Sequence, residues 1–143
     1  MAKLKTYGKG DRLEVQAQQI WLILTARAML CPPVGSDLRK SLLYYGDLAE
    51  AMGKDRKARM VLGRQLGIVG VYCIDHDLPP LNVIVVSQET GQPGSEVVLS
   101  PGSSVQQDQH RVFRQDWFGI RPPSIKALKD VYYSDNFRRW YSR

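Results

Sequence analysis

The first part of the chain carries the apolar pattern of one long helix. From Asp11 to Leu30, apolar residues recur at steps of three and four, which is the spacing of a buried helix face: Leu13, Ala17, Ile20, Trp21, Leu24 and Ala28. Cys31-Pro32-Pro33 then ends the helix, because proline cannot donate the next backbone hydrogen bond. We therefore predict an amphipathic helix over residues 11–30 with Trp21 in the core.

The next apolar positions are interrupted by turn residues. Leu38–Leu43 fits either a helical turn or a short extended piece. Asp47–Met52 predicts a short helix, and Gly53 follows it as a residue typical of a helix C-terminus.

A basic helix is predicted after this turn. Asp55 is a candidate N-cap for a helix from Arg56 to about Leu66, which has apolar residues on one side and basic residues on the remainder. Gly67 predicts a bend, after which Ile68–Asp77 continues as a further helical piece.

A β-hairpin is predicted next. Leu81–Val86 is a continuous, mostly β-branched run, which is typical of a buried strand. Ser87–Gly94 carries turn signals, and Glu96–Leu99 is then a returning strand. Two short helices followed by such a hairpin, or wing (residues 81–99), indicate a winged helix-turn-helix.

The C-terminal third predicts more helix. Val105 to about Trp117 has helical spacing after the loop 101–104, which ends on the N-cap candidate Ser104, and Ser124 caps a helix over Ile125–Tyr133. We therefore predict an α+β fold with a winged helix-turn-helix core, a small β-hairpin wing and a C-terminal helical extension. Its parts are expected to be a flexible arm over 1–10, the winged-helix domain over 11–100 and the packed extension over 101–143.

The charge of the chain favours an anionic partner. Among 143 residues, 20 are Lys or Arg and 14 are Asp or Glu, a formal net charge of +6, while 43% apolar residues are ordinary for a folded protein. Such a surplus favours nucleic acid first and speeds the encounter with it.

The cysteines and the apolar runs suggest an intracellular protein. Cys31 and Cys73 are the only cysteines, as expected for reduced thiols in the cytoplasm. The first residues carry positive charge without the apolar region of a signal peptide, and no run is long enough to span a membrane. We therefore expect a cytoplasmic protein without a membrane partner.

One stretch resembles a known family of DNA-binding proteins. The motif Tyr44 to Ala49, the Ala/Arg segment Ala58 to Gly63, the run Leu81 to Val86 and the turn Ser87 to Gly94 follow one another in order. This series resembles the DNA-binding domain of alkylguanine-DNA alkyltransferases, and still more their non-enzymatic relatives, the alkyltransferase-like proteins. The resemblance covers roughly residues 11–94. The pattern is also similar to that of small bacterial and phage proteins.

The chain departs from this family at the reactive position. Asn82 stands where the family has its alkyl-acceptor cysteine, and Val83-Ile84 stand at the family's His-Arg. An amide has no thiolate to accept an alkyl group. Asn82 is thus interpreted as a pseudo-active-site residue, and we expect no enzyme activity and no cofactor.

The resemblance implies contacts with duplex DNA at matching positions. Tyr45 would lie at the entrance of the first helix, against a phosphate or a rotated nucleotide. Arg59 would fill the gap left by a displaced base, although one extra residue in Met60–Gly63 leaves this match open. The other expected DNA contacts are Arg56, Lys57, Arg64, Gln88 and Thr90. The alternative is that Tyr45 packs on the core and the basic residues form a solvated face.

The aromatic C-terminal third suggests a second function class. Trp, Tyr and Arg are enriched in interface hot spots, and the candidate partner surface is Trp117, Phe118, Arg138, Arg139 and Trp140. The alternative function is therefore a protein-interaction module, such as an inhibitor or subunit in a phage–bacterium defence system.

One pair of residues has the spacing of a partial metal site. Cys73 and His76 lie one helical turn apart, which could supply two zinc ligands. No second pair accompanies them, so we favour a buried Cys73, an exposed His76 and no metal.

Overall fold

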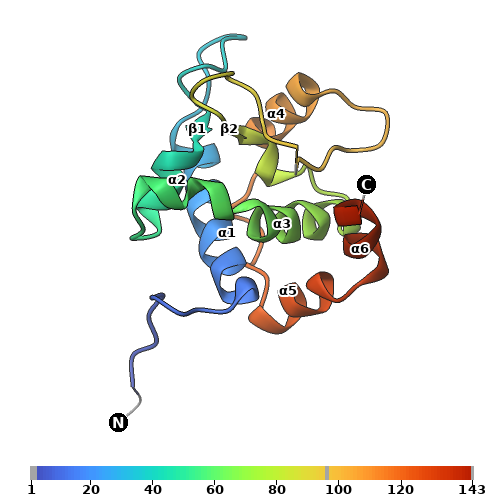
Figure 1. Ribbon diagram of the computed structural model, residues 1–143. Coiled ribbons are helices and arrows are strands. Elements are labelled where there is room, and N and C mark those ends of the chain that lie inside the picture. Colours follow the sequence, from blue (N-terminus) through green and yellow to red (C-terminus); the bar gives the residue numbers. More distant parts are fainter. Residues whose placement is uncertain (1–2, 96, 143) are drawn as a thin grey trace.

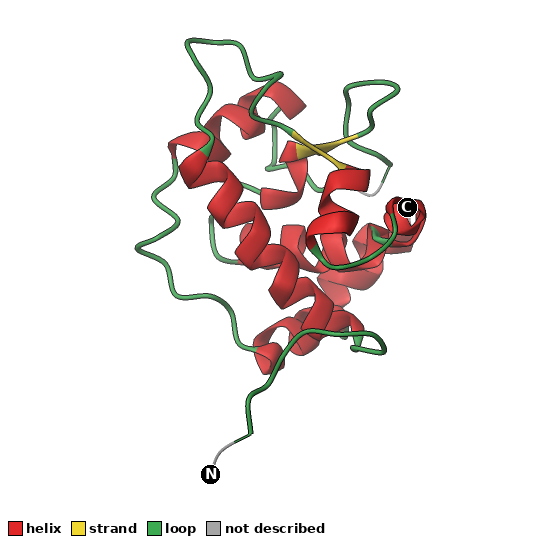
Figure 2. Ribbon diagram, turned by 90° about the vertical axis from the view of Figure 1, so that its left-hand side faces the viewer, coloured by secondary structure: helices red, strands yellow, loops and turns green. Residues whose placement is uncertain are grey.

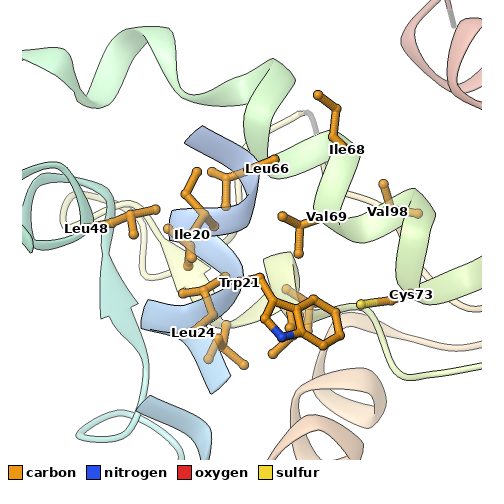
Figure 3. Packing of buried hydrophobic residues seen from close by; sticks show 14 of the residues in the cluster. Ile20, Trp21, Leu24, Leu48, Leu66, Ile68, Val69, Cys73 and Val98 are labelled. Atoms are coloured by element: carbon orange, nitrogen blue, oxygen red, sulfur yellow. The ribbon is translucent and has the colours of Figure 1, made fainter. Parts of the chain in front are cut away.

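Helix α1 (Leu13–Leu30) crosses the centre of the molecule, and other helices pack around it (Figure 1). The computed structural model describes residues 3–95 and 97–142. The apolar face predicted from the sequence is confirmed, because Ala17, Ile20, Trp21, Leu24 and Ala28 are buried. Helices α3 (Gly63–Asp75) and α5 (Ile125–Tyr132) pack against α1. Figure 3 shows part of this core: Ile20, Trp21, Leu24, Leu66, Val69 and Cys73.

The remaining elements are short. They are strand β1 (Leu43–Tyr44), helix α2 (Tyr45–Ala51), 3-10 helices η1 (Arg56–Val61) and η2 (Leu81–Ile84), strand β2 (Val85–Val86), and helices α4 (Val105–Arg114) and α6 (Asp135–Ser142). The protein is therefore a mixed α+β fold that is mostly helical. Within the described residues, no helix has the length and apolar character needed to cross a membrane.

The two strands form a parallel pair. Leu43 pairs with Val85 and Tyr44 with Val86, at the end of the molecule away from the N-terminal segment (Figure 2). The prediction of a strand over residues 81–86 is therefore wrong for most of its length. Leu81–Ile84 forms a 3-10 helix whose four residues are buried, and only Val85–Val86 pairs with another strand.

The predicted hairpin is also wrong within the described residues. Val85–Val86 pairs with β1 and not with a returning strand, and Val97–Leu99 belongs to no strand. Glu96 lies outside the described residues. The segment between them does turn back, because the Ser87 N–H donates to the Gln92 carbonyl at 2.9 Å. Gly91 has a φ of 71°, which glycine adopts without strain.

The predicted basic helix is divided differently in the structure. Residues 56–61 form η1, in which no residue is buried, and α3 begins only at Gly63. Helix α3 then runs through Gly67 without a bend. Its middle is covered on several sides, by α1, α5, α6 and η2. The exposed basic ridge is thus a 3-10 turn beside α3, and the body of α3 is core.

The C-terminal helices are part of the same core. The expected serine caps are confirmed: the Ser104 side chain accepts from Gln107 N–H, and the Ser124 side chain accepts from Ala127 N–H. Helix α4 ends at Arg114, before the predicted limit. The tail forms α6, which packs against α3 and α5. The segment before α1 contacts this helix, since the Tyr7 hydroxyl donates to Gln18 Oε1 at 2.7 Å.

Candidate nucleic-acid interface

A pocket of about 510 Å³ lies between the start of α2, η1 and the loop after β2. It brings together residues that are far apart in the sequence. Four of the seven predicted DNA contacts line it, namely Tyr45, Arg56, Arg59 and Gln88. The other lining residues are Tyr44, Gly46, Met60, Gly63, Ser87, Glu89, Gly94 and Ser95.

The parallel strand pair creates one wall of this pocket. Tyr44 pairs with Val86, and the residues that follow the two strands, Tyr45 and Ser87, both line the pocket. The Tyr45 hydroxyl then accepts a hydrogen bond from the Gly94 N–H at 2.7 Å. Tyr45 therefore has a structural role, holding the end of the 87–94 loop against α2, and it still faces the pocket.

Arg56 crosses the pocket floor over Gly46. A Cβ at residue 46 would lie 2.6 Å from an Arg56 guanidinium nitrogen, so a larger residue here would displace the Arg56 side chain from this position. Arg56 donates to Asp47 Oδ1 at 2.5 Å and to Glu50 Oε1 at 2.6 Å. The hydrogen bond to Asp47, followed by that to Glu50, raises the pKa of Arg56. Its positive charge is compensated by two carboxylates, which weakens its predicted role as a phosphate contact.

The outer edge of the pocket is η1. The Asp55 side chain caps it by accepting from the Lys57 N–H at 2.8 Å, as the sequence predicted. Lys57 and Arg59 are exposed on this turn. Met60 is 79% exposed and Val61 67%, so the edge offers apolar side chains next to basic ones.

The three remaining predicted DNA contacts are exposed around the pocket and do not line it. Lys57 lies on η1, and Thr90 accepts from the Gln92 N–H within the loop at 3.1 Å. Arg64 donates from Nε to the Tyr141 hydroxyl of α6 at 3.1 Å. The predicted DNA contacts thus comprise four pocket residues and three exposed residues beside the pocket, of which two are cations.

The side chain of Asn82 is buried in the interior. It is 3% exposed, and neither polar atom of its side-chain amide has a hydrogen-bond partner among the described residues. Its amide lies against Gly70 of α3, outside the lining of the pocket. The position that matches the acceptor cysteine therefore carries a core side chain.

The thiol of Cys73 is also unsuited to nucleophilic chemistry. Burial raises its pKa to about 12, so the thiol stays protonated at neutral pH. His76 is exposed, as predicted, and its Nδ1 lies 2.8 Å from the Tyr72 carbonyl oxygen. Across residues 3–95 and 97–142, no three His, Cys, Asp or Glu side chains gather as metal ligands would.

The predicted partner surface is only partly at the surface. Trp117 is 1% exposed and meets Trp21 edge to face at 5.5 Å, so its prediction as an interface residue is wrong. It is core because its indole N–H is satisfied internally, by the Val112 carbonyl at 2.8 Å. Trp140 is half-buried against Gly67, whereas Phe118, Arg138 and Arg139 are exposed.

Sequence reasoning missed several features of the residues in and beside the pocket. Gly46 was treated only as part of a motif, although its contact with Arg56 shapes the floor. Asp47 and Glu50, three residues apart on α2, are the acidic partners of Arg56, and their helical spacing was a usable signal. The exposure of Met60 and Val61 had no sequence signal, since a basic-apolar segment is compatible with a buried face.

No protein-family model, curated protein or solved structure matches this chain.

Proposed function

We propose that this chain is a non-catalytic DNA-binding protein of the alkyltransferase-like type. One observation carries the proposal. Tyr45, Arg56, Arg59 and Gln88, selected from the sequence as DNA contacts, converge on one pocket from three separate segments. Chance placement of scattered surface residues does not predict this convergence.

The charges around the pocket support a phosphate partner. Lys57 and Arg59 are exposed at its edge, and the chain has a net charge of +6. Cations of this kind bind the DNA backbone without reading its sequence. Because the body of α3 is buried, the proposed contact with duplex DNA is made by η1, the start of α2 and the 87–94 loop.

The pocket supports recognition of a modified or distorted base. Its volume of about 510 Å³ lies within the range of about 300–1,000 Å³ found for small-molecule sites. The exposed ring of Tyr44 and the exposed apolar side chain of Met60 offer contacts for a displaced base, while Gln88 offers an amide for hydrogen bonding. No alkyl transfer is proposed, because the Asn82 side chain has no nucleophilic atom and the Cys73 thiol is buried with a raised pKa.

A salt titration tests the proposal. Binding of plain, alkylated and single-stranded oligonucleotides is measured by fluorescence anisotropy over a range of salt concentrations. We expect salt-dependent duplex binding, with a slope that Arg59→Ala makes shallower by about 0.9. Lys126→Ala is the control, since it removes one exposed charge on α5. The proposal fails if the parent shows no salt-dependent binding, or if both variants behave alike.

A second candidate function rests on the exposed apolar residues. Met60, Val61 and Phe118 are 79%, 67% and 63% exposed, and such side chains favour a protein partner. This candidate is the protein-interaction module of a phage–bacterium defence system. A pull-down that survives nuclease but is lost in Met60→Ser would favour it over DNA binding.

A further inference from the structure

Helix α6 lies antiparallel along α3, and its C-terminal end lies beside Arg64, the second residue of α3. At one end, the Asn136 side chain of α6 donates to Asp75 at the end of α3, at 3.0 Å. At the other end, Arg64 at the start of α3 donates to the Tyr141 hydroxyl of α6, at 3.1 Å. Trp140 lies between these ends, against Gly67.

Tyr141 is held in place by the core, although it is itself exposed. Its ring stacks on Phe137 with centroids 5.8 Å apart and planes 12° apart. Phe137 is buried, and the Trp140 indole N–H donates to the Val97 carbonyl at 3.3 Å. A surface hydroxyl is thus fixed relative to α3.

Tyr141 in turn fixes Arg64. The Arg64 Cζ atom lies 5.3 Å from the Tyr141 ring centroid, in addition to the hydrogen bond from Nε. The hydrogen bond that Arg64 donates to Tyr141 raises the pKa of Arg64, and Tyr132 contributes in the same direction. An arginine held this way loses less conformational freedom when it binds a phosphate than a mobile side chain does.

The helix spacing places a second cation on the same side. At about 100° per residue, Arg138 lies about 60° from Tyr141 around α6, whereas Arg139 lies about 160° away. Arg139 is directed elsewhere, since it donates to Asn136 Oδ1 at 2.7 Å. Arg64 and Arg138 therefore flank Tyr141, and both are exposed.

We propose that α6 is a second part of the nucleic-acid surface, in which Arg64 and Arg138 bind the phosphate backbone and Tyr141 is the positioning residue of Arg64. This inference rests on the proposed DNA-binding function and extends it. Arg64 lies three residues after the end of η1, the turn that carries Lys57 and Arg59, and α6 is tied to Arg64 through Tyr141. A longer duplex segment is thereby contacted than the pocket alone would cover.

Four variants test the inference by anisotropy with a short duplex over a range of salt concentrations. Arg64→Gln and Arg138→Gln should each make the salt slope shallower by about 0.9, because each removes one phosphate contact. Tyr141→Phe keeps the ring and the charge of Arg64, so affinity should fall about fivefold, the effect of one hydrogen bond, at an unchanged slope. The matched control, Arg139→Gln, removes the same charge from the same helix and should leave the slope nearly unchanged.

Two further measurements separate positioning from a merely structural role. Tyr141→Phe combined with Arg64→Gln should bind no more weakly than Arg64→Gln alone, because the hydroxyl acts through Arg64. Thermal unfolding should show a folded protein for every variant.

The inference is overturned if Arg64→Gln and Arg138→Gln match Arg139→Gln, or if Tyr141→Phe binds more tightly, which would mean that α6 restrains Arg64 away from DNA. If Arg59→Ala weakens binding while Arg64→Gln, Arg138→Gln and Tyr141→Phe do not, this inference alone fails. If the parent does not bind DNA, the proposed function fails with it.

Discussion

Gly70 of α3 and Asn82 of η2 are in direct contact, so that a Cβ at residue 70 would lie 2.7 Å from the Asn82 Oδ1 atom. This approach allows the 3-10 turn to pack closely on α3. Asn82 is buried and cannot swing away into solvent. The position that resembles an acceptor site is therefore a packing contact.

Gly70→Ala should destabilise the protein by about 1–3 kcal/mol, measured by denaturant unfolding. The overlap with a buried amide outweighs the helix-propensity gain of alanine, which is about 0.5–1 kcal/mol. Gly8→Ala is the control, because a Cβ at residue 8 meets nothing within 4 Å. Combining Gly70→Ala with Asn82→Ala should cost less than the sum of the two single changes. An additive result would contradict the contact.

Asp108 organises the loop before α4 and is fully buried. Its carboxylate accepts from the Ser100 N–H at 2.7 Å and from the Ser103 hydroxyl at 2.9 Å. Asp108→Ala removes the acceptor of the Ser100 N–H and leaves the Ser103 hydroxyl only its longer contact with the Ser104 carbonyl at 3.3 Å, so it should lower the free energy of unfolding by about 2 kcal/mol. Arg111→Ala, which removes only the half-exposed ion-pair partner of Asp108, should cost about 0–1 kcal/mol. Equal losses in the two variants would show that the ion pair, and not the loop, matters.

Glu50 should oppose DNA binding through its contact with Arg56. Glu50→Gln removes one of the two carboxylates that compensate Arg56, so DNA affinity should rise several-fold and the salt slope should become steeper. Asp130→Asn on α5 makes the same change of net charge at a different ion pair. The prediction concerns the difference between them: if both variants bind DNA equally well, Arg56 has no local role in the interface.

Cys73 should be inert to thiol reagents in the folded protein, whereas the partly exposed Cys31 should react. The measurement is labelling by a disulfide reagent near neutral pH, before and after unfolding. Rapid labelling of Cys73 in a Cys31→Ala variant under native conditions would contradict the burial of this thiol.

The raised pKa of Cys73 also predicts a pH dependence of stability. Its pKa is about 12 in the folded protein, against an ordinary value of 9.0. Below about pH 9 both states keep the proton, and the thiol makes no pH-dependent difference. Between about pH 9 and about pH 12 the unfolded chain loses it first, so stability should fall by up to about 1.4 kcal/mol per pH unit. Cys73→Ala, measured in parallel by urea unfolding, should lack this part of the decline.

Trp117 and Phe118 should differ sharply although they are adjacent. Trp117→Ala removes a buried ring packed on Trp21 and should cost about 3–5 kcal/mol in unfolding free energy. Phe118→Ala removes an exposed ring and should change stability by less than about 0.5 kcal/mol. Of these two neighbours, Phe118 is the one suitable for testing a protein partner, and a large stability loss in Phe118→Ala would contradict this division.

The sequence alone determined the local features of this protein. The three- and four-residue spacing of apolar positions identified α1 and its buried face, because a helix repeats its faces within a few residues. Ser104, Ser124 and Asp55 were identified as caps, since a cap depends on atoms only two or three residues away. The pocket residues Tyr45, Arg56, Arg59 and Gln88 were also selected from the sequence, by resemblance.

Only the tertiary structure decided how these parts contact each other. The run 81–86 is β-branched, but which residues form a strand depends on Leu43–Tyr44, about forty residues away in the chain, which supply the partner. Gly67 was interpreted as a bend and instead lies within α3, where the ring of Trp140 occupies the space that a side chain would need. The compensation of Arg56 and the fixing of Arg64 by Tyr141 likewise depend on distances between elements, which local spacing does not encode.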